Sequence, residues 1–212
     1  MTIEISAYRW VPPFAQGWVR DLRLRWALEE AGLAYTVILI DVGTVKSAEY
    51  RLWQPFGQVP AYRDDEVEMF ESGAAVLHIA EKSQILAPED PAGRARVTSW
   101  VIAALNSIEP FAQAVIHFDH TLPGAAERLV QPQALLDARL ADLSAWLGDK
   151  PHLEDRFTAG DLIMTTVLRE LVDSGILARF PNLAAYRERC EARPAFRRAL
   201  EGQMSVFRAN AP

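Results

Sequence analysis

The stretch GQVPAYRDDEVEMFESGAAVLHIAEK, residues 57–82, decides the fold. Two short apolar runs, 59–63 and 67–70, flank the polar turn at 64–66, and this arrangement predicts a β-hairpin. A helical pattern follows directly over 71–82. The stretch therefore predicts two antiparallel strands that lead straight into a helix.

The residues before this stretch predict a βαβ unit. Residues 3–7 alternate apolar and polar side chains as a strand does, and 35–40 are β-branched and aromatic. Between them, 17–31 carries apolar residues at helical spacing, and Gly32 stands where a helix needs a left-handed terminal residue. A short helix is predicted over 46–53.

The residues after the stretch are helical in period. A proline-marked connector covers 84–91, and we predict helices at about 92–118, 132–147, 159–172, 183–193 and 195–208. The expected division is an α/β domain over 1–83, a linker over 84–91 and an all-helical domain over 92–212.

Composition narrows the possible partners. The 212 residues include 22 basic and 28 acidic ones, and the net charge of −6 argues against nucleic acid or an anionic membrane as the main partner. The arginines within 20–25 and 187–198 fall between apolar residues, so we predict solvated helix faces. There is no apolar run long enough to cross a bilayer, and a single cysteine suits a reducing compartment, so we expect a cytoplasmic protein.

Two positions in the deciding stretch suggest a ligand site. The bond before Pro60 can be cis at low cost, and a cis bond would turn the Val59 N–H and C=O toward an extended peptide. An ordinary trans proline is the alternative. At the start of the helix, Glu71 and Ser72 stand where unpaired N–H groups and the macrodipole can receive a carboxylate. Plain helix capping is the alternative there.

A further motif concerns stability alone. Thr158 followed by Asp161 predicts a capping box at the start of a helix in the second half of the chain. Such a cap contributes about 1–2 kcal/mol and carries no chemistry.

Together, GQVP at 57–60, ES at 71–72, FTAGD at 157–161 and LEEAGL at 28–33 resemble the glutathione transferase family over essentially the whole chain. The resemblance implies an α/β plus all-α fold, in which a thioredoxin-like N-terminal domain (βαβ-ββα) precedes a helical domain. It also implies a homodimeric enzyme of detoxification that uses glutathione as co-substrate and holds no metal.

The resemblance implies glutathione contacts from Lys46, Gln58, Val59, Pro60, Glu71 and Ser72. Pro60 would be cis, with the Val59 backbone pairing with the cysteinyl unit. Glu71 and Ser72 would hold the γ-glutamyl end. Lys46 resembles the basic residue that contacts the glycyl carboxylate, and Arg51 and Trp53 are alternatives for that role.

The chain departs from the family at the group that activates the glutathione sulfur. The position that often reads Ser-Ser-Cys-Ser reads WVRD at 18–21, and no Ser, Thr or Cys lies between Tyr8 and Tyr35. Tyr8, at the end of the first strand, and Arg20, in the first turn of the helix, are the catalytic candidates. Backbone N–H groups alone, or loss of activity, are the alternatives.

The resemblance also implies an electrophile pocket, for which the candidates are Trp10, Asn106, Phe111 and Phe118. Helical spacing puts Phe111 and Phe118 on one face, which suits core packing equally well. The histidines at 78, 117, 120 and 152 show no metal-like spacing with cysteine or acidic partners, so no metal site is expected.

The function expected from these observations is transfer of glutathione to small, partly apolar electrophiles, by conjugation or peroxide reduction. The alternative is a non-catalytic module of the same fold that binds ligands or proteins. A thiol–disulfide oxidoreductase is disfavoured because no cysteine lies near the first helix.

Overall fold

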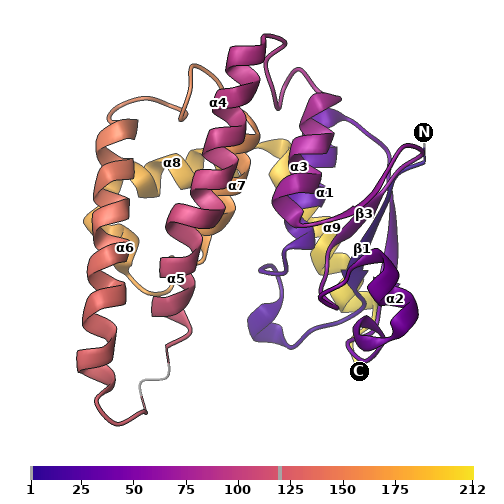
Figure 1. The fold of residues 1–212 in the computed structure, drawn as a ribbon, viewed down its shortest axis with the longest axis horizontal. Helices are drawn as coiled ribbons and strands as arrows, with labels where there is room; N and C mark the ends of the chain where they lie inside the picture. The colour runs from indigo at the N-terminus through magenta and orange to yellow at the C-terminus, as the bar shows by residue number, and fades with distance from the viewer. Residues whose placement is uncertain (1, 119–120) are drawn as a thin grey trace. The chain divides into compact units, whose positions relative to one another are not determined.

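The computed structural model describes residues 2–118 and 121–212 (Figure 1). It divides into two compact units, one formed by Met1–Pro88 with Ala192–Pro212 and the other by Glu89–Glu191. Each unit is described by itself. Within the described residues, none of the helices is both long and apolar enough to cross a membrane.

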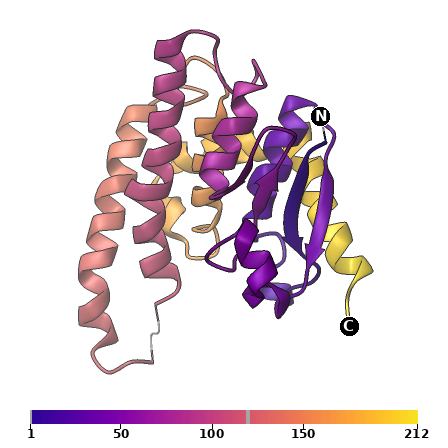
Figure 2. The same ribbon diagram turned by 45° about the vertical axis from the view of Figure 1, so that its right-hand side comes forward.

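A mixed four-stranded sheet organises the first unit (Figure 2). Its strand order is β2-β1-β3-β4, in which β1 (Glu4–Tyr8) runs parallel to β2 (Thr36–Ile40). Next to β1 on its other side, β3 (Ala61–Arg63) is antiparallel and forms a hairpin with β4 (Glu68–Phe70). This is the βαβ-ββα order that the sequence predicts, so the expected thioredoxin-like fold is confirmed.

The helical elements of the first unit fall close to their predicted places, apart from η1, which was predicted as a loop, and the later start of α1. They are η1 (Pro13–Ala15), α1 (Asp21–Ala31), η2 (Thr44–Lys46), α2 (Ala48–Trp53), α3 (Ser72–Glu81) and α9 (Pro194–Ala209). Gly32 ends α1 with φ of 66°, which is the left-handed conformation predicted for it.

The C-terminal helix α9 groups with the first unit. Its ring at Phe196 lies edge-on to Trp26 of α1, with 4.8 Å between the centroids. Trp26 is completely buried, and burying aromatic side chains of this size is strongly favourable. The predicted helical domain over 92–212 therefore ends too late, because the apolar face of α9 is covered by α1.

Helix α1 is buried on nearly every side, including its charged residues. Arg23 and Arg25 are each only 3% exposed, so the prediction of a solvated arginine face is wrong for them. Arg25 forms an ion pair with buried Asp21 at 2.7 Å, and Arg193 from the start of α9 binds Glu30 at 2.6 Å. Buried charges persist when they are paired in this way.

The second unit is helical throughout its described residues. Its elements are α4 (Pro91–Ile102), a π-helical segment (Ala103–Ile108), α5 (Glu109–Ile116), α6 (Ala125–Leu147), α7 (Ala159–Arg169), η4 (Ile176–Arg179) and α8 (Pro181–Glu191). The single helix predicted over 92–118 is interrupted because Pro110 has no N–H to continue the α-helical ladder. The next helix begins at Ala125, before the predicted start, and Pro132 lies inside it.

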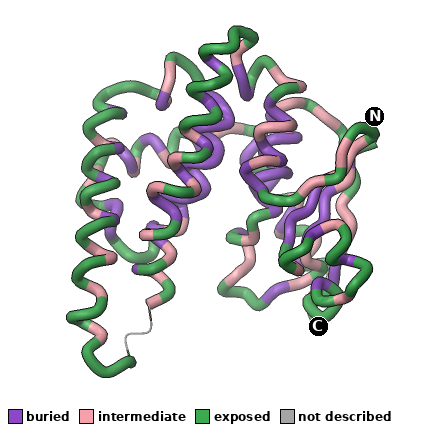
Figure 3. Tube along the Cα trace, in the orientation of Figure 1, coloured by how far each residue is buried: buried purple, intermediate pink, exposed green. Residues whose placement is uncertain are grey.

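Helix α7 forms the centre of the second unit, and every one of its residues is buried (Figure 3). The capping box is confirmed, since the Thr158 hydroxyl accepts from the Gly160 N–H and Asp161 accepts from the Thr158 N–H. A Cβ at Gly160 would lie 2.7 Å from the Cβ of Trp100 on α4. Glycine in this motif is therefore required by the close approach of α4 to α7.

Candidate functional site

The loop before β3 presents an unpaired stretch of backbone. The Val59–Pro60 bond is cis, which is one of the two alternatives left open by the sequence. The Val59 side chain is buried in a small apolar cluster with Ile40, Val45 and Tyr50. Among the residues that the structure describes, the Val59 N–H and C=O have no hydrogen-bond partner. These two backbone groups are therefore open to pairing with an extended peptide.

Glu71 joins the hairpin to helix α3. Strand β4 ends at Phe70 and α3 begins at Ser72, so one residue makes the whole change of direction. Its φ of 68° is a conformation that residues other than glycine rarely adopt. Backbone strain of this kind is concentrated at functional sites. The conformation also fixes the direction in which the Glu71 side chain leaves the backbone.

The first turn of α3 is prepared for an anion. No side chain caps it, so the N–H groups of its first turn have no intrahelical acceptor. Ser72 is buried, and its hydroxyl oxygen accepts from the Arg23 guanidinium at 3.2 Å. Because that bond uses a lone pair of Ser72, its proton stays available to a ligand. The buried guanidinium adds positive charge to the macrodipole.

The register of the hairpin brings these two features together. Ala61 pairs with Phe70 across β3 and β4. Pro60 and Glu71 follow directly outside this pair, so both lie at the same end of the hairpin. The unpaired Val59 backbone and the open turn of α3 thus belong to one small region.

A third element approaches the same loop. Gly57 has φ of 65°, and a Cβ there would lie 2.6 Å from the Val45 carbonyl oxygen. Glycine therefore lets η2, which ends at Lys46, approach the loop before Val59. Lys46 is exposed and has no ion pair among the described residues.

The two alternatives to Lys46 differ in their surroundings. Trp53 donates its indole N–H to the Tyr62 carbonyl at 3.0 Å, and the Arg63 guanidinium stacks 4.8 Å above its ring. The Trp53 side chain is therefore already bound to residues of the sheet. Arg51 is exposed, so it remains available as a second cation beside Lys46.

Tyr8, the first catalytic candidate, lies on the side of the sheet that carries Val59. It shares a face of β1 with Ser6, since alternate residues of a strand point the same way. Its half-buried ring packs against the cluster that contains Val59. Burial raises the pKa of Tyr8, so its hydroxyl stays protonated at neutral pH. Within the described residues this hydroxyl has no hydrogen-bond partner, and it is free to donate.

Arg20 and Trp10 lie in the segment that joins β1 to α1. Arg20 is exposed and is the N-cap residue of α1, directly before its first turn, because the helix begins at Asp21 and not at the predicted residue 17. Trp10 is half-buried next to the end of β1. Gln16 closes the loop by donating to the Val11 carbonyl at 3.0 Å.

Comparison with known proteins bears on the same regions. The protein-family model of the glutathione S-transferase N-terminal domain matches residues 16–81. Disulfide-bond oxidoreductase YfcG of Escherichia coli is 30% identical over 82% of this chain and 86% of its own length. Glutathione S-transferase F13 of Arabidopsis thaliana is 30% identical over 70% of this chain and 74% of its own length. The chain belongs to the glutathione S-transferase family.

Solved structures agree with this assignment at the level of the fold. A glutathione transferase from Burkholderia graminis, solved with two glutathione molecules bound per subunit, superposes with a TM-score of 0.79. It is 22% identical and covers 94% of this chain and 88% of its own. At this identity the structural likeness shows the fold alone, which is that of a glutathione transferase.

The remaining pocket candidates of this glutathione transferase family member lie in the second unit. Asn106 is exposed in the π-helical segment, and Phe111 is half-buried on α5. Phe118 is half-buried but lies beyond Ile116, where α5 ends. The prediction that Phe111 and Phe118 share a helix face is therefore wrong, because the helical period stops before Phe118.

Ser6, Tyr50 and Arg23 contribute to the site but were missed by the sequence prediction. Tyr50 donates to the Gln58 carbonyl at 2.7 Å, and Ser6 lies 2.8 Å from the Tyr50 hydroxyl. Ser6 could have been noticed as a small polar residue between the apolar Ile5 and Ala7. Nothing in the local pattern distinguishes Arg23 from the solvated arginines of an ordinary helix.

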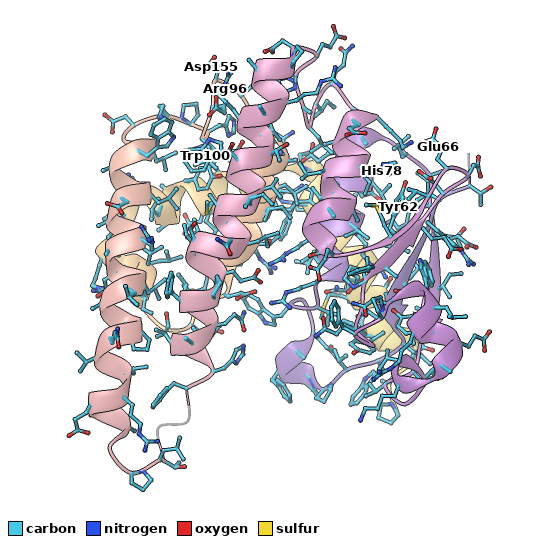
Figure 4. The ribbon with its side chains drawn as sticks, viewed as in Figure 1. Tyr62, Glu66, His78, Arg96, Trp100 and Asp155 are labelled. Atoms are coloured by element: carbon cyan, nitrogen blue, oxygen red, sulfur yellow. The ribbon has the colours of Figure 1, made fainter. Side chains whose placement is uncertain are left out.

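A cluster of possible metal ligands gathers where the hairpin meets α3 (Figure 4). Ligand atoms of Asp64, Glu66 and His78 lie within 4.8 Å of one another. However, the Lys82 ammonium already lies 2.8 Å from Glu66 and 3.5 Å from Asp64. The Lys82 ammonium group balances the negative charge that would attract a metal ion. We therefore interpret the cluster as a polar network that holds the hairpin against α3. His120, another histidine considered from the sequence, lies outside the described residues.

Asp64 is the centre of this polar network. Its side chain is fully buried, and burial opposes ionisation. Hydrogen bonds from His78, from the Glu66 and Val67 N–H groups and from Tyr62 outweigh that effect, and they hold the pKa of Asp64 well below its usual range. A carboxyl whose pKa is lowered by folding stabilises the fold above its unfolded pKa of about 3.9 and loses that contribution as the pH falls.

We therefore predict that Asp64→Asn lowers the free energy of unfolding at pH 7, and that its difference from the wild type shrinks as the pH falls from about 5 to 3. Urea unfolding at several pH values measures both quantities. Asp149→Asn, at an exposed carboxyl without a partner among the described residues, serves as the control and should change neither. A difference for Asp64→Asn that is independent of pH would contradict the proposed role of its charge.

Proposed function

We propose that this protein binds glutathione in its first unit and uses the glutathione thiolate against small, partly apolar electrophiles. The observation that carries the proposal is the juxtaposition of the unpaired Val59 backbone with the uncapped, positively charged start of α3. An extended peptide with a carboxylate at one end satisfies both. Glutathione has this chemistry, and membership of the glutathione S-transferase family supports it.

In this proposal each part of the tripeptide has its own contact. The Val59 N–H and C=O pair with the cysteinyl unit beside Pro60 and Gln58. Ser72 and the first turn of α3 take the γ-glutamyl carboxylate, and the Glu71 carboxylate accepts from the ammonium group. Lys46 binds the glycyl carboxylate, since it is the exposed cation on the element that Gly57 admits.

The activating group is Tyr8 in this proposal. A free thiol has a pKa of about 8.5, so a hydrogen bond to the sulfur that favours the thiolate raises the concentration of nucleophile at neutral pH. Tyr8 carries a protonated hydroxyl without a partner among the described residues, on the face that carries Val59. Arg20 is the second candidate, acting by charge. The electrophile residues Trp10, Asn106, Phe111 and Phe118 remain predictions.

Conjugation and peroxide reduction both follow from such a thiolate. The name of the relative YfcG favours a second candidate, glutathione-dependent reduction of disulfides. The only cysteine here, Cys190, is completely buried, so bound glutathione would have to supply every thiol. A non-catalytic binding module is distinguished from all three by glutathione binding without turnover of chloronitrobenzene, hydroperoxide or disulfide substrates.

We also propose that the protein is a cytoplasmic homodimer. The single, buried cysteine suits a reducing compartment. Leu52 and Phe56 are 88% and 65% exposed, and Phe56 lies edge-on to Phe70 with 5.8 Å between the ring centroids. Exposed apolar groups gathered in this way are typical of an interaction surface. A second copy of the chain is the partner that family membership favours.

Glutathione binding tests the central claim. Isothermal titration should detect binding at millimolar glutathione or below, and Ser72→Ala should weaken it by about tenfold or more, since hydrogen bonds to charged groups contribute about 1.5–3 kcal/mol. Ser99→Ala removes an exposed hydroxyl that donates to the Ala95 carbonyl and should leave affinity unchanged. Absence of binding to the folded wild-type protein would overturn the assignment.

The role of Tyr8 is tested by turnover. Tyr8→Phe keeps the ring in its cluster and removes the donor, so we expect the conjugation rate to fall at least tenfold with the glutathione Kd unchanged. The pH dependence of thiolate formation by bound glutathione, followed by ultraviolet absorbance, should shift to higher pH. Equal rates for Tyr8→Phe and the wild type would transfer the role to Arg20, for which Arg20→Gln is the matching variant.

The dimer surface is tested by substitution of its most exposed aromatic ring. Phe56→Ser should shift the sedimentation coefficient from that of a dimer toward that of a monomer, because it removes the apolar group at the centre of the patch. Phe14→Ser, at an 83% exposed ring in η1, is the matched control and should leave the dimer intact. A wild-type protein that sediments as a monomer at micromolar concentration would refute the proposal.

A further inference from the structure

A chain of hydroxyl groups supports the loop that carries Val59. The Tyr50 hydroxyl donates to the Gln58 carbonyl at 2.7 Å, and the Ala61 N–H donates to the Ser6 hydroxyl at 2.7 Å. The two hydroxyls are 2.8 Å apart. Because the only proton of Tyr50 is used at Gln58, Ser6 must donate to Tyr50. The sequence of donors is therefore Ala61, Ser6, Tyr50 and finally the Gln58 carbonyl.

This hydroxyl relay fixes the backbone on both sides of Val59 and Pro60. It holds the carbonyl of the residue before them and the amide of the residue after them. The Gln58 N–H is satisfied separately by the Gln54 side chain at 3.2 Å. The Val59 N–H and C=O have no hydrogen-bond partner among the described residues, so the relay orients them without occupying them.

The surroundings of Tyr50 make the relay rigid. Tyr50 is only 6% exposed, in the cluster with Ile40, Val45 and Val59. Its ring meets Trp53 edge-on at 6.2 Å, and Trp53 is itself hydrogen-bonded to the sheet. Burial also raises the pKa of the Tyr50 hydroxyl, which keeps it a donor over the physiological range.

We propose that Tyr50, acting through Gln58 and Ser6, is a positioning residue that holds the Val59 backbone ready for glutathione. The inference rests on the proposed function and adds to it a residue that makes no contact with the tripeptide. A binding loop that is already in its bound conformation loses less entropy when the ligand arrives. Loss of the relay should therefore weaken binding and leave the chemical step unchanged.

The first measurement is the binding of glutathione to Tyr50→Phe, which keeps the aromatic ring in its cluster and removes only the hydroxyl. We expect the glutathione Kd and KM to rise about five- to tenfold, the change associated with one net hydrogen bond. The kcat at saturating glutathione should stay within about twofold of the wild-type value. Ser6→Ala should show the same division between KM and kcat.

The matched control is Tyr62→Phe. This tyrosine is also buried, but its hydroxyl donates to Asp64 in the turn of the hairpin, outside the relay. Tyr62→Phe should lower Tm without changing the glutathione Kd. Wild-type affinity in Tyr50→Phe overturns the inference. A fall in kcat together with a rise in KM that both follow the loss of Tm in Tyr50→Phe also overturns it.

Amide hydrogen exchange provides a readout that does not depend on glutathione. In both variants the Ala61 amide should exchange faster than in the wild type. Ser6→Ala removes the hydroxyl that accepts from the Ala61 N–H, and Tyr50→Phe removes the group that orients this hydroxyl. If the wild type binds no glutathione, the proposed function fails, and exchange at Ala61 still shows whether the relay holds the loop. Unchanged exchange at Ala61 in both variants refutes the relay.

Discussion

The structure depends on the burial of helix α1 between α3 and α9. A helix covered on both sides has no solvated face, so each of its charged groups needs a partner. Asp21 pairs with Arg25 and also accepts from Gln203 of α9, and Glu30 binds Arg193. Breaking such a buried pair leaves an uncompensated charge, which destabilises strongly. The two contacts to α9, from Gln203 to Asp21 and from Arg193 to Glu30, therefore fix the position of α1 along its own axis as well as its rotation.

That position determines where the candidate site lies. Arg23 projects from the same helix toward the first turn of α3 and donates to Ser72. Because α1 cannot slide without separating Glu30 from Arg193 and Asp21 from Gln203, the guanidinium remains beside the uncapped N–H groups. The positive character of this corner is thus a consequence of how the core is assembled, and it adds to the dipole of α3.

The features that could be predicted from the sequence are those formed by residues close together along the chain. The hairpin, the capping box at Thr158 and the left-handed end of α1 at Gly32 each lie within a few residues, where turn and cap chemistry is decisive. The relay was not predictable, since Ser6 and Tyr50 are 44 residues apart. Neither was the pairing of Arg23 with Ser72, which are 49 residues apart.

The errors of prediction have the same origin. The period of α9 correctly indicated a helix, but a hydrophobic face does not specify which helix covers it, and here Trp26 does. Pro110 was visible in the sequence, yet apolar spacing alone suggested continuity through it. The missing N–H shifts the ladder into a π-helical segment and lets the chain continue as α5.

The surroundings of Tyr8 and Arg20 favour a neutral donor over a cation as the group that activates the glutathione sulfur. Tyr8 lies on a face of β1 that is shared with Ser6 and packed against Val59, so its direction is set by the sheet and the apolar cluster. Arg20 is exposed at the positive end of α1, where the macrodipole disfavours a cation and water screens its charge. Burial raises the pKa of Tyr8, which makes it a poor base at neutral pH but preserves its proton for donation. A thiolate needs a donor that remains in place as its charge develops, and in the proposed reaction Tyr8, held by the sheet, would be that donor.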